Sequence, residues 1–300
     1  MLIFSGGSNK KLAEKIANGL ALSLGELEIV TFPDNENRVR VIDQVLDQDV
    51  ILVQSTGITP NLFYMELFFI LDSLKRSGAK SITLVIPYLG YQRQDHIFRE
   101  GEAVSLNVII KLLEELGVTK VVSFDFHSIK IPVMFSVPVI HLSALEAFAN
   151  LINEDASDDL VLVSPDMGGI ARIKKLSEMT NGLPFASIVK DRDLNTGDIQ
   201  SAQINGEVKK KAIIVDDVVS TGKTLVSAAD LLRKNGVSEI TVMATHAILA
   251  KDAPKLLQDS VIEKIIVTDT INLPENRKFP KLEIISVSDQ IAKELKDENT

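Results

Sequence analysis

One stretch in the second half of the chain most limits what it can fold into. It reads Ala-Ile-Ile-Val at 212–215, then Asp216-Asp217, Val-Val, Ser220-Thr221-Gly222-Lys223-Thr224 and an apolar helical pattern from Leu225. The four apolar residues predict a buried strand, because a parallel sheet covered on both faces gives a continuous apolar run. The stretch therefore predicts a strand that ends near two carboxylates, a tight polar turn and a helix.

This turn and its carboxylates together indicate a ligand. Successive backbone N–H groups and the dipole of the following helix favour a phosphate. Asp216 and Asp217 supply acceptors for the vicinal hydroxyls of a sugar. Gly222-Lys223-Thr224 also occurs in the P-loop motif, but that motif needs a glycine where Asp217 stands, and an aspartate there repels phosphate. We therefore reject the P-loop and predict a ribose phosphate site.

The composition narrows the class of protein. The 300 residues are 45% hydrophobic, which is enough for two domains with sizeable cores, and the net charge of −9 disfavours general binding to nucleic acid or to a membrane surface. The sequence contains no apolar run of about 18 residues, which is the length that would predict a membrane span. The chain has no cysteine, which excludes thiol chemistry and fits a reducing cytoplasm.

Strand and helix signals alternate along the chain, which is the pattern of helices layered on mostly parallel sheets. Helices are expected to follow Ser8 to about residue 24, Pro60 to 76, residue 105 to about 116, residue 170 to 180, and 289–295, with Ser8 and Ser288 as N-caps. The two halves look alike, which suggests a duplicated fold with a site between the halves. The predicted strands are 2–5, 28–32, 38–42, 50–54, 81–86, 121–124, 160–163, 185–189, 212–217, 239–245 and 264–268.

Polar segments follow several of these strands, at the edge where open α/β sheets bind ligands. Arg93 in the loop 87–96 either contacts a purine or phosphate or belongs to a solvated loop, and His96 is a candidate phosphate contact. His127 either holds a metal or is a structural hydrogen-bonding group, whereas Asp166 stands where a strand-end metal ligand would. The charged run 190–193 is either a solvated turn or a cationic flap over a phosphate. His141 and His246 receive no role.

The ordered set of these segments closely resembles the ribose-phosphate diphosphokinase family, also called phosphoribosyl pyrophosphate synthetases. The resemblance covers nearly all 300 residues. Each segment alone is weak evidence for the family, but the ordered set is highly specific. The matching segments are 32–36, 54–56, 65–67, 72–76, 87–95, 101–102, 125–127, 164–169 and 216–224.

The resemblance implies transfer of a diphosphoryl group from ATP to ribose 5-phosphate, with Mg²⁺ as cofactor. It implies two phosphoribosyltransferase-type (type I) α/β domains with mostly parallel sheets: 1–146, with the C-terminal helix 287–300 packed on it, and 147–286. It further implies a homo-oligomer, a dimer or larger, whose adenine site is shared between subunits. Carried over by position, the sites are Lys190 and Arg192 for catalysis; Phe32, Asp34, Glu36, Arg93, Gln94, Asp95 and His96 for ATP; Arg192, Asp216, Asp217, Ser220, Thr221, Gly222, Lys223 and Thr224 for ribose 5-phosphate; and His127 and Asp166 for the metal.

Two departures from the family pattern keep other functions open. Asn35 replaces the glycine of the adenine loop, although asparagine tolerates left-handed backbone geometry. Asp191 interrupts the basic flap and lowers its positive potential. The alternatives are a non-catalytic homologue of the synthetase and a phosphoribosyltransferase, which would need only one such domain.

Overall fold

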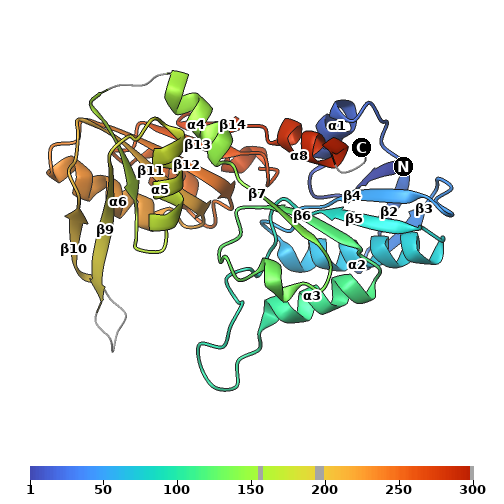
Figure 1. The fold of residues 1–300 in the computed structure, drawn as a ribbon. Helices are drawn as coiled ribbons and strands as arrows, with labels where there is room; N and C mark the ends of the chain where they lie inside the picture. Colours follow the sequence, from blue (N-terminus) through green and yellow to red (C-terminus); the bar gives the residue numbers. More distant parts are fainter. Residues whose placement is uncertain (155–157, 193–198, 298–300) are drawn as a thin grey trace. The chain divides into compact units, whose positions relative to one another are not determined.

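The computed structural model describes residues 1–154, 158–192 and 199–297, without the side chains of 190–192 and 199–201. The chain forms two compact units (Figure 1). Unit 1 holds Met1–Ser143, Asp269–Asn272 and the residues from Ser286 onward, and unit 2 holds Ala144–Thr268 and Leu273–Ile285. The chain therefore returns to unit 1 twice, and the sequence pattern does not predict the short return at 269–272. Among the described residues, none of the helices is long and apolar enough to cross a membrane.

Unit 1 is built on a parallel sheet in the order β1-β4-β5-β6-β7, with an antiparallel hairpin, β2–β3, before β4. Helices cover both faces of the sheet, and for this reason its strands are nearly continuous apolar runs. The elements are β1 (Leu2–Ser5), α1 (Lys10–Gly19), β2 (Leu27–Thr31), β3 (Asn37–Val41), β4 (Asp49–Val53), α2 (Pro60–Arg76), β5 (Ser81–Val85), α3 (Ser105–Glu115), β6 (Lys120–Phe124), the 3₁₀ turn η1 (Pro132–Met134), β7 (Val139–Leu142) and α8 (Ser288–Asp297).

Unit 2 repeats this plan with two more strands at one edge. Its sheet order is β10-β9-β8-β11-β12-β13-β14, and all neighbours are parallel except β9 and β10. Helices α4 and α5 cover one face with an apolar core. The elements are α4 (Leu145–Glu154), β8 (Leu160–Ser164), α5 (Ile170–Met179), β9 (Phe185–Arg192), β10 (Ile199–Asn205), β11 (Lys211–Val219), α6 (Lys223–Lys234), β12 (Glu239–Ala247), α7 (Ala253–Gln258), β13 (Lys264–Thr268), η2 (Glu275–Arg277) and β14 (Leu282–Ile285).

The succession of elements is the same in both units: strand, helix, antiparallel pair, strand, helix, strand, helix and two strands. Strand β4 of unit 1 therefore corresponds to β11 of unit 2, and α2 corresponds to α6. This correspondence agrees with the likeness between the halves that the sequence pattern suggests. It also aligns the loops at the carboxyl ends of the strands, where α/β proteins bind their ligands.

The segment Asp269–Asn272, which we call the strap, is held in unit 1 by side-chain hydrogen bonds. The backbone carbonyl of Asp269 accepts from Asn9 Nδ2 at 2.7 Å, and that of Thr270 accepts from Ser55 Oγ at 2.6 Å. The Asp269 carboxylate pairs with Lys15 at 2.8 Å and accepts from the backbone N–H of Val287 at 3.0 Å. Helix α8 completes the same side of the unit by packing on α1.

The structure corrects four local expectations. Asn9, not Ser8, caps α1, because its side chain accepts from Leu12 N; the Ser8 hydroxyl instead donates to Gln54 Oε1 at 2.8 Å. Helix α1 ends at Gly19 rather than near residue 24, because the chain then turns to bring Leu24 beside Ile3 of β1. The other two corrections concern strands. Strand β11 runs on to residue 219 by pairing with β12, and β9 runs on to residue 192 by pairing with β10.

Candidate active site

The predicted phosphate turn lies in unit 2 between β11 and α6. Gly222 is the N-cap of α6 with a left-handed backbone (φ 75°), and its carbonyl accepts from Val226 N at 3.0 Å. Thr221, Lys223 and Thr224 are exposed, and none of their side chains bonds to another group in the described part of the chain. The first turn of a twelve-residue helix thus presents free N–H groups, hydroxyls and a cation at one point, which is a favourable setting for an anion.

Gly222→Ala is expected to lower the free energy of unfolding more than the control Gly236→Ala. Both glycines are left-handed (φ 75° and 91°), a conformation that costs an alanine about 1 kcal/mol. A Cβ at residue 222 would also lie 3.0 Å from Leu257 Cγ, whereas one at residue 236 meets nothing within 4 Å. Urea denaturation of both variants measures the difference. Equal losses would contradict a turn held tightly against α7.

Asp216 and Asp217 lie inside β11 rather than beyond its end, and Arg172 of α5 faces both of them. The guanidinium Nη1 is 3.4 Å from Asp216 Oδ1, and Nη2 is 3.4 Å from Asp217 Oδ1. The pKa of Asp216 is well above its ordinary value, mainly because the group is buried and also because Asp217 is its neighbour; Arg172 opposes this rise. The arrangement favours one shared proton on the two carboxylates, beside a cation.

Arg172 was missed by the sequence analysis. It follows Asp166 by six residues and lies inside a helix, where a lone arginine in a sequence looks like a surface residue. Only the packing of α5 on β8, the strand that pairs with β11, brings it to the carboxylates. The available signal was weak: a cation in the first turn of a helix that starts at the ligand-binding edge of the sheet.

Asp166 stabilises the loop between β8 and α5. Its Oδ1 accepts from the backbone N–H groups of Gly168 at 2.9 Å and Gly169 at 3.3 Å, and its own carbonyl accepts from Ser164 Oγ at 2.8 Å. The loop therefore holds the exposed carboxylate in one orientation. Oxygen ligands of this kind suit Mg²⁺, which keeps several waters and takes only one or two protein carboxylates.

In unit 1, the candidate ATP segment follows β5. Arg93, Gln94 and His96 are exposed, whereas Asp95 is half-buried and accepts His96 Nδ1 at 2.6 Å. The backbone of Gln94 is fixed at both ends, because its N–H donates to Tyr91 at 2.8 Å and its carbonyl accepts from Leu106 N at 3.2 Å. The segment thus presents a cation and polar groups from a fixed backbone.

His127 follows β6, the next strand of the same sheet. Its side chain is exposed, and its backbone N–H donates to Gln92 Oε1 at 2.9 Å. His141, to which the sequence analysis gave no role, accepts the backbone N–H of Phe126 through Nε2 at 3.1 Å. Nε2 must therefore be unprotonated in this contact. The loop at the end of β6 is held by side chains from two other segments.

The hairpin β2–β3 carries the candidate adenine residues at its tip. Phe32 N donates to Glu36 O at 2.8 Å, and the Asp34 carboxylate accepts from Glu36 N at 3.1 Å. Asn35 has a left-handed backbone (φ 70°), which is the geometry that the family's glycine would take. Phe32 is 40% exposed, and Arg38 lies 5.8 Å from its ring centre. An exposed aromatic ring beside a cation can stack against a planar ligand.

A second copy of the turn sequence explains why the two units differ. Ser55-Thr56-Gly57-Ile58-Thr59, between β4 and α2, matches Ser220-Thr221-Gly222-Lys223-Thr224 in order and in topological place. In unit 1, however, Ser55 and Thr56 are buried, the Ser55 hydroxyl donates to the strap, and a Cβ on Gly57 would lie 2.8 Å from Ile271. The strap covers this copy of the turn, and the likeness predicted between the halves did not extend to this match.

The candidate residues are divided between the units. Unit 1 carries those at 32–36, 93–96 and 127, and unit 2 carries those at 166, 172, 216–217 and 220–224. Lys190 and Arg192 lie on β9, which pairs with β10, but their side chains are outside the description. Within the described residues, no group of three or more histidines and acids gathers in one place, so the structure has no all-protein metal cage there.

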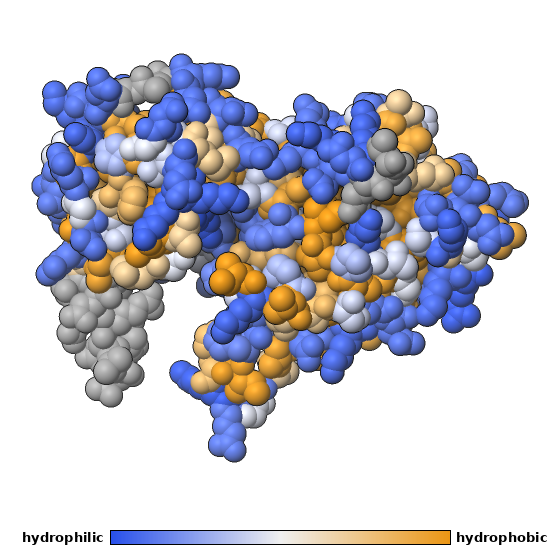
Figure 2. Space-filling model, viewed as in Figure 1, coloured by the Kyte–Doolittle hydropathy of each residue, from blue (hydrophilic) through white to orange (hydrophobic). Residues whose placement is uncertain are grey.

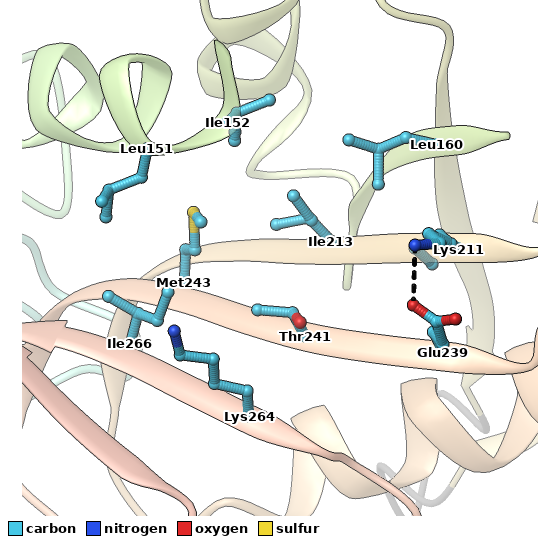
Figure 3. Close-up of a pocket in the computed structure, with 11 residues that line it drawn as sticks. Leu151, Ile152, Leu160, Lys211, Ile213, Glu239, Thr241, Met243, Lys264 and Ile266 are labelled. Atoms are coloured by element: carbon cyan, nitrogen blue, oxygen red, sulfur yellow. Dashed lines mark ion pairs between the residues drawn. The ribbon is translucent and has the colours of Figure 1, made fainter. Parts of the chain in front are cut away.

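A cavity of about 200 Å³ lies at the opposite edge of the sheet in unit 2 (Figure 3). Its floor is apolar, and Lys211 pairs with Glu239 at 3.1 Å at its rim. These residues begin β11 and β12, so the cavity is at the amino ends of the strands, and none of the predicted site residues lines it. It therefore plays no part in the candidate site.

The fold and the turn are typical of one class of protein: α/β proteins with an anion-binding turn at the carboxyl ends of parallel strands. Comparisons with known proteins narrow that class. Residues 1–117 match the family described as the N-terminal domain of ribose phosphate pyrophosphokinase, and residues 195–297 match the phosphoribosyl synthetase-associated domain.

Relatives match almost the whole chain. The ribose-phosphate pyrophosphokinase of Fusobacterium nucleatum is 38% identical over 97% of this chain and 92% of its own length, and that of Caldanaerobacter subterraneus is 39% identical over 95% and 90%. The crystal structure of phosphoribosylpyrophosphate synthetase from Mycobacterium smegmatis superposes with a TM-score of 0.93 at 32% identity, covering 100% of this chain and 99% of that one. The chain belongs to the ribose-phosphate pyrophosphokinase family, which confirms the predicted family and the predicted α/β class.

Proposed function

We propose that this chain is a cytoplasmic ribose-phosphate diphosphokinase: it transfers the diphosphoryl group of ATP to the anomeric hydroxyl of ribose 5-phosphate, giving phosphoribosyl pyrophosphate and AMP. The main support is the contrast between the two turns. The turn of unit 2 is open and lies beside Asp216 and Asp217, whereas the turn of unit 1 is covered by the strap. One sugar-phosphate site per chain leaves the polar loops of unit 1 for a nucleotide.

Ribose 5-phosphate binds at the turn of unit 2. Ser220 to Thr224 hold its phosphate through backbone N–H groups, hydroxyls and the Lys223 ammonium, with Arg192 as a further cation. Asp216 and Asp217 accept hydrogen bonds from the ribose hydroxyls, and Arg172 fixes their orientation. The positive charge of an arginine bound to both carboxylates reduces their repulsion of each other and of a negatively charged sugar phosphate.

ATP binds along unit 1. Arg93, Gln94, Asp95 and His96 line the nucleotide, and Phe32, Asp34 and Glu36 contact the adenine bound to a neighbouring subunit. The hairpin tip that carries these three residues is exposed in the single chain. This role requires at least a dimer.

Exposed apolar side chains in unit 1 support an oligomer. Leu62, Met65 and Phe69 are spaced along one face of α2, and Val108 and Leu112 along one face of α3. Figure 2 shows apolar side chains at the surface of this unit. Exposed apolar side chains that line one face of a helix are typical of protein–protein contacts.

His127 and Asp166 are each candidate ligands of Mg²⁺, whose other ligands would be ATP phosphates. Each residue supplies one exposed donor on a hydrogen-bonded loop, and a cation that takes most of its ligands from phosphates and waters needs no more from the protein. When bound, the ion neutralises phosphate charge. The chain's own contribution is to orient both substrates for in-line attack, with Lys190 and Arg192 supplying positive charge for the transferred group.

AMP formation by the purified full chain with ATP, ribose 5-phosphate and Mg²⁺ tests the proposal. AMP that appears only when the sugar is present, together with phosphoribosyl pyrophosphate detected by ³¹P NMR, is the expected result. A folded protein that binds ribose 5-phosphate and releases no AMP would instead be the non-catalytic homologue. Activity towards a nucleobase and phosphoribosyl pyrophosphate would identify a phosphoribosyltransferase.

His127→Ala is expected to raise the Mg²⁺ concentration needed for half-maximal rate by about 10-fold, because one metal ligand is lost. The KM for ribose 5-phosphate should stay near wild type, since the sugar is bound by unit 2. Initial rates over a Mg²⁺ series at fixed substrates measure this. Lys130→Ala, three residues along the same exposed loop, is the control. An unchanged Mg²⁺ requirement would remove His127 from the metal site.

A further inference from the structure

The loop that carries His127 lies just beyond a buried strand but is not held by strand pairing. The N–H of Phe126 bonds to His141 Nε2 at 3.1 Å, and the N–H of His127 bonds to Gln92 Oε1 at 2.9 Å. The Asp125 carboxylate accepts from Ser143 Oγ at 2.6 Å. Backbone groups at a buried strand end need such partners. Each of these partners also fixes the direction in which the next side chain projects.

Gln92 differs from the other two partners because it lies inside the candidate ATP segment, next to Arg93. It is only 2% exposed, although both residues that follow it are exposed. Burial of a glutamine among polar loops requires hydrogen bonding, and its Oε1 obtains this from His127. A single buried side chain thus joins the segment at the end of β5 to the loop at the end of β6.

The segment that holds Gln92 is itself rigid. Tyr91 has a left-handed backbone (φ 64°), and its hydroxyl bonds to Asn61. Thr56 Oγ1 accepts from Gly90 N at 2.7 Å, and the buried Tyr64 hydroxyl donates to Gly90 O at 2.9 Å. An anchored segment can impose its position on a neighbouring loop, whereas a mobile segment cannot.

We propose that Gln92 is a positioning residue: its amide oxygen fixes the backbone of His127 at a set distance from Arg93 and Gln94. The inference rests on the proposed function, in which His127 contacts the metal and Arg93 and Gln94 contact the nucleotide that shares it. Metal ligands depend on partners that orient them, and loss of one such partner typically lowers metal affinity by 10- to 100-fold. Gln92 does this through the main-chain N–H of His127.

Gln92→Met is the test variant, because methionine fills a similar volume and offers only a weakly accepting sulfur in place of the amide oxygen. Mn²⁺ binding in the presence of ATP and the absence of ribose 5-phosphate, followed by electron paramagnetic resonance, is expected to weaken by about 10-fold. Hydrogen exchange of the peptide spanning residues 125–128, without metal, should become faster. The KM for ribose 5-phosphate should not change.

The matched control is Thr119→Val. Thr119 makes two comparable bonds to the backbone of Ile82 in the same unit, at the amino ends of the strands. It should lower the melting temperature and leave Mn²⁺ binding unchanged. A double-mutant cycle with His127→Ala then separates positioning from general stability: Gln92→Met should weaken Mn²⁺ binding no further once His127 is absent.

The outcomes distinguish a failure of the metal assignment of His127 from a failure of the positioning role of Gln92. If His127→Ala leaves Mn²⁺ binding intact, the metal assignment fails, and the role of Gln92 fails with it. If His127→Ala weakens binding and Gln92→Met does not, or if the two losses add, only the role of Gln92 is overturned. Should Gln92→Met not fold, rapid exchange of the His127 amide in the wild-type protein would still refute the inference.

Discussion

Lys190→Ala is expected to lower kcat by about 100-fold, because in the proposed reaction this residue supplies a cation that stabilises charge in the transition state. The melting temperature should change little. Lys190 is on β9, near the edge of the sheet in unit 2, and its backbone pairs with Ala202 of β10, a contact that the substitution keeps. AMP formation at saturating substrates, beside a thermal melt, measures both quantities.

Lys209→Ala is the control for this effect. Lys209 lies in the same unit and pairs with Glu207 at 3.7 Å, a surface pair that contributes little to stability. It should leave kcat unchanged, which excludes a general effect of removing positive charge. A Lys190→Ala enzyme with near-normal turnover would remove this lysine from the mechanism. In that case Arg192→Ala becomes the decisive variant.

Arg172→Met is expected to lower the free energy of unfolding by about 3 kcal/mol at neutral pH, because it leaves two buried carboxylates without their cation. The same change should raise the KM for ribose 5-phosphate, since Asp216 and Asp217 lose the group that orients them. Urea denaturation and initial rates measure the two effects. Lys174→Met, an exposed cation on the same helix, should change neither.

The stability loss of Arg172→Met is expected to depend on pH. The pKa of Asp216 is already raised by burial and by Asp217, and removal of the arginine raises it further. Both folded proteins therefore keep a proton that the unfolded chain loses above about pH 4, and the variant keeps its proton to a higher pH than the wild type does. The loss caused by the substitution should therefore be smallest in acid and should grow as pH rises past the pKa of Asp216 in the folded wild type. A loss independent of pH would contradict a carboxylate pair held by Arg172.

Much of the fold could be predicted because its strands are covered on both faces. Buried parallel strands leave apolar runs, such as those at 50–53 and 212–215, that are visible without a structure. The short edge strands β7 and β14 were missed, because a polar residue interrupts the apolar run of each: His141 in β7 and Glu283 in β14. Helix α4 was missed because its last turn lies in the polar, acidic stretch 150–159.

The candidate site was predictable only where its residues are neighbours along the chain. The turn 220–224 is read from one stretch, because its N–H groups, hydroxyls and helix start are contiguous. Arg172 and Gln92 act through partners that are 44 and 35 positions away along the chain. Such pairings depend on how a helix packs or how a loop bends, and residue types alone do not encode those distances.

The strap and α8 also determine when unit 1 can finish folding during synthesis. Unit 1 is made first, yet the surface of α1 and the turn at Gly57 are covered by residues 269–272 and 288–297. A nascent chain therefore leaves the ribosome with apolar groups of its first unit open until residues 288–297 emerge. Incomplete domains of this kind are prone to aggregate and are substrates for chaperones. A premature stop that removes only the final helix should damage the part of the protein that was translated first.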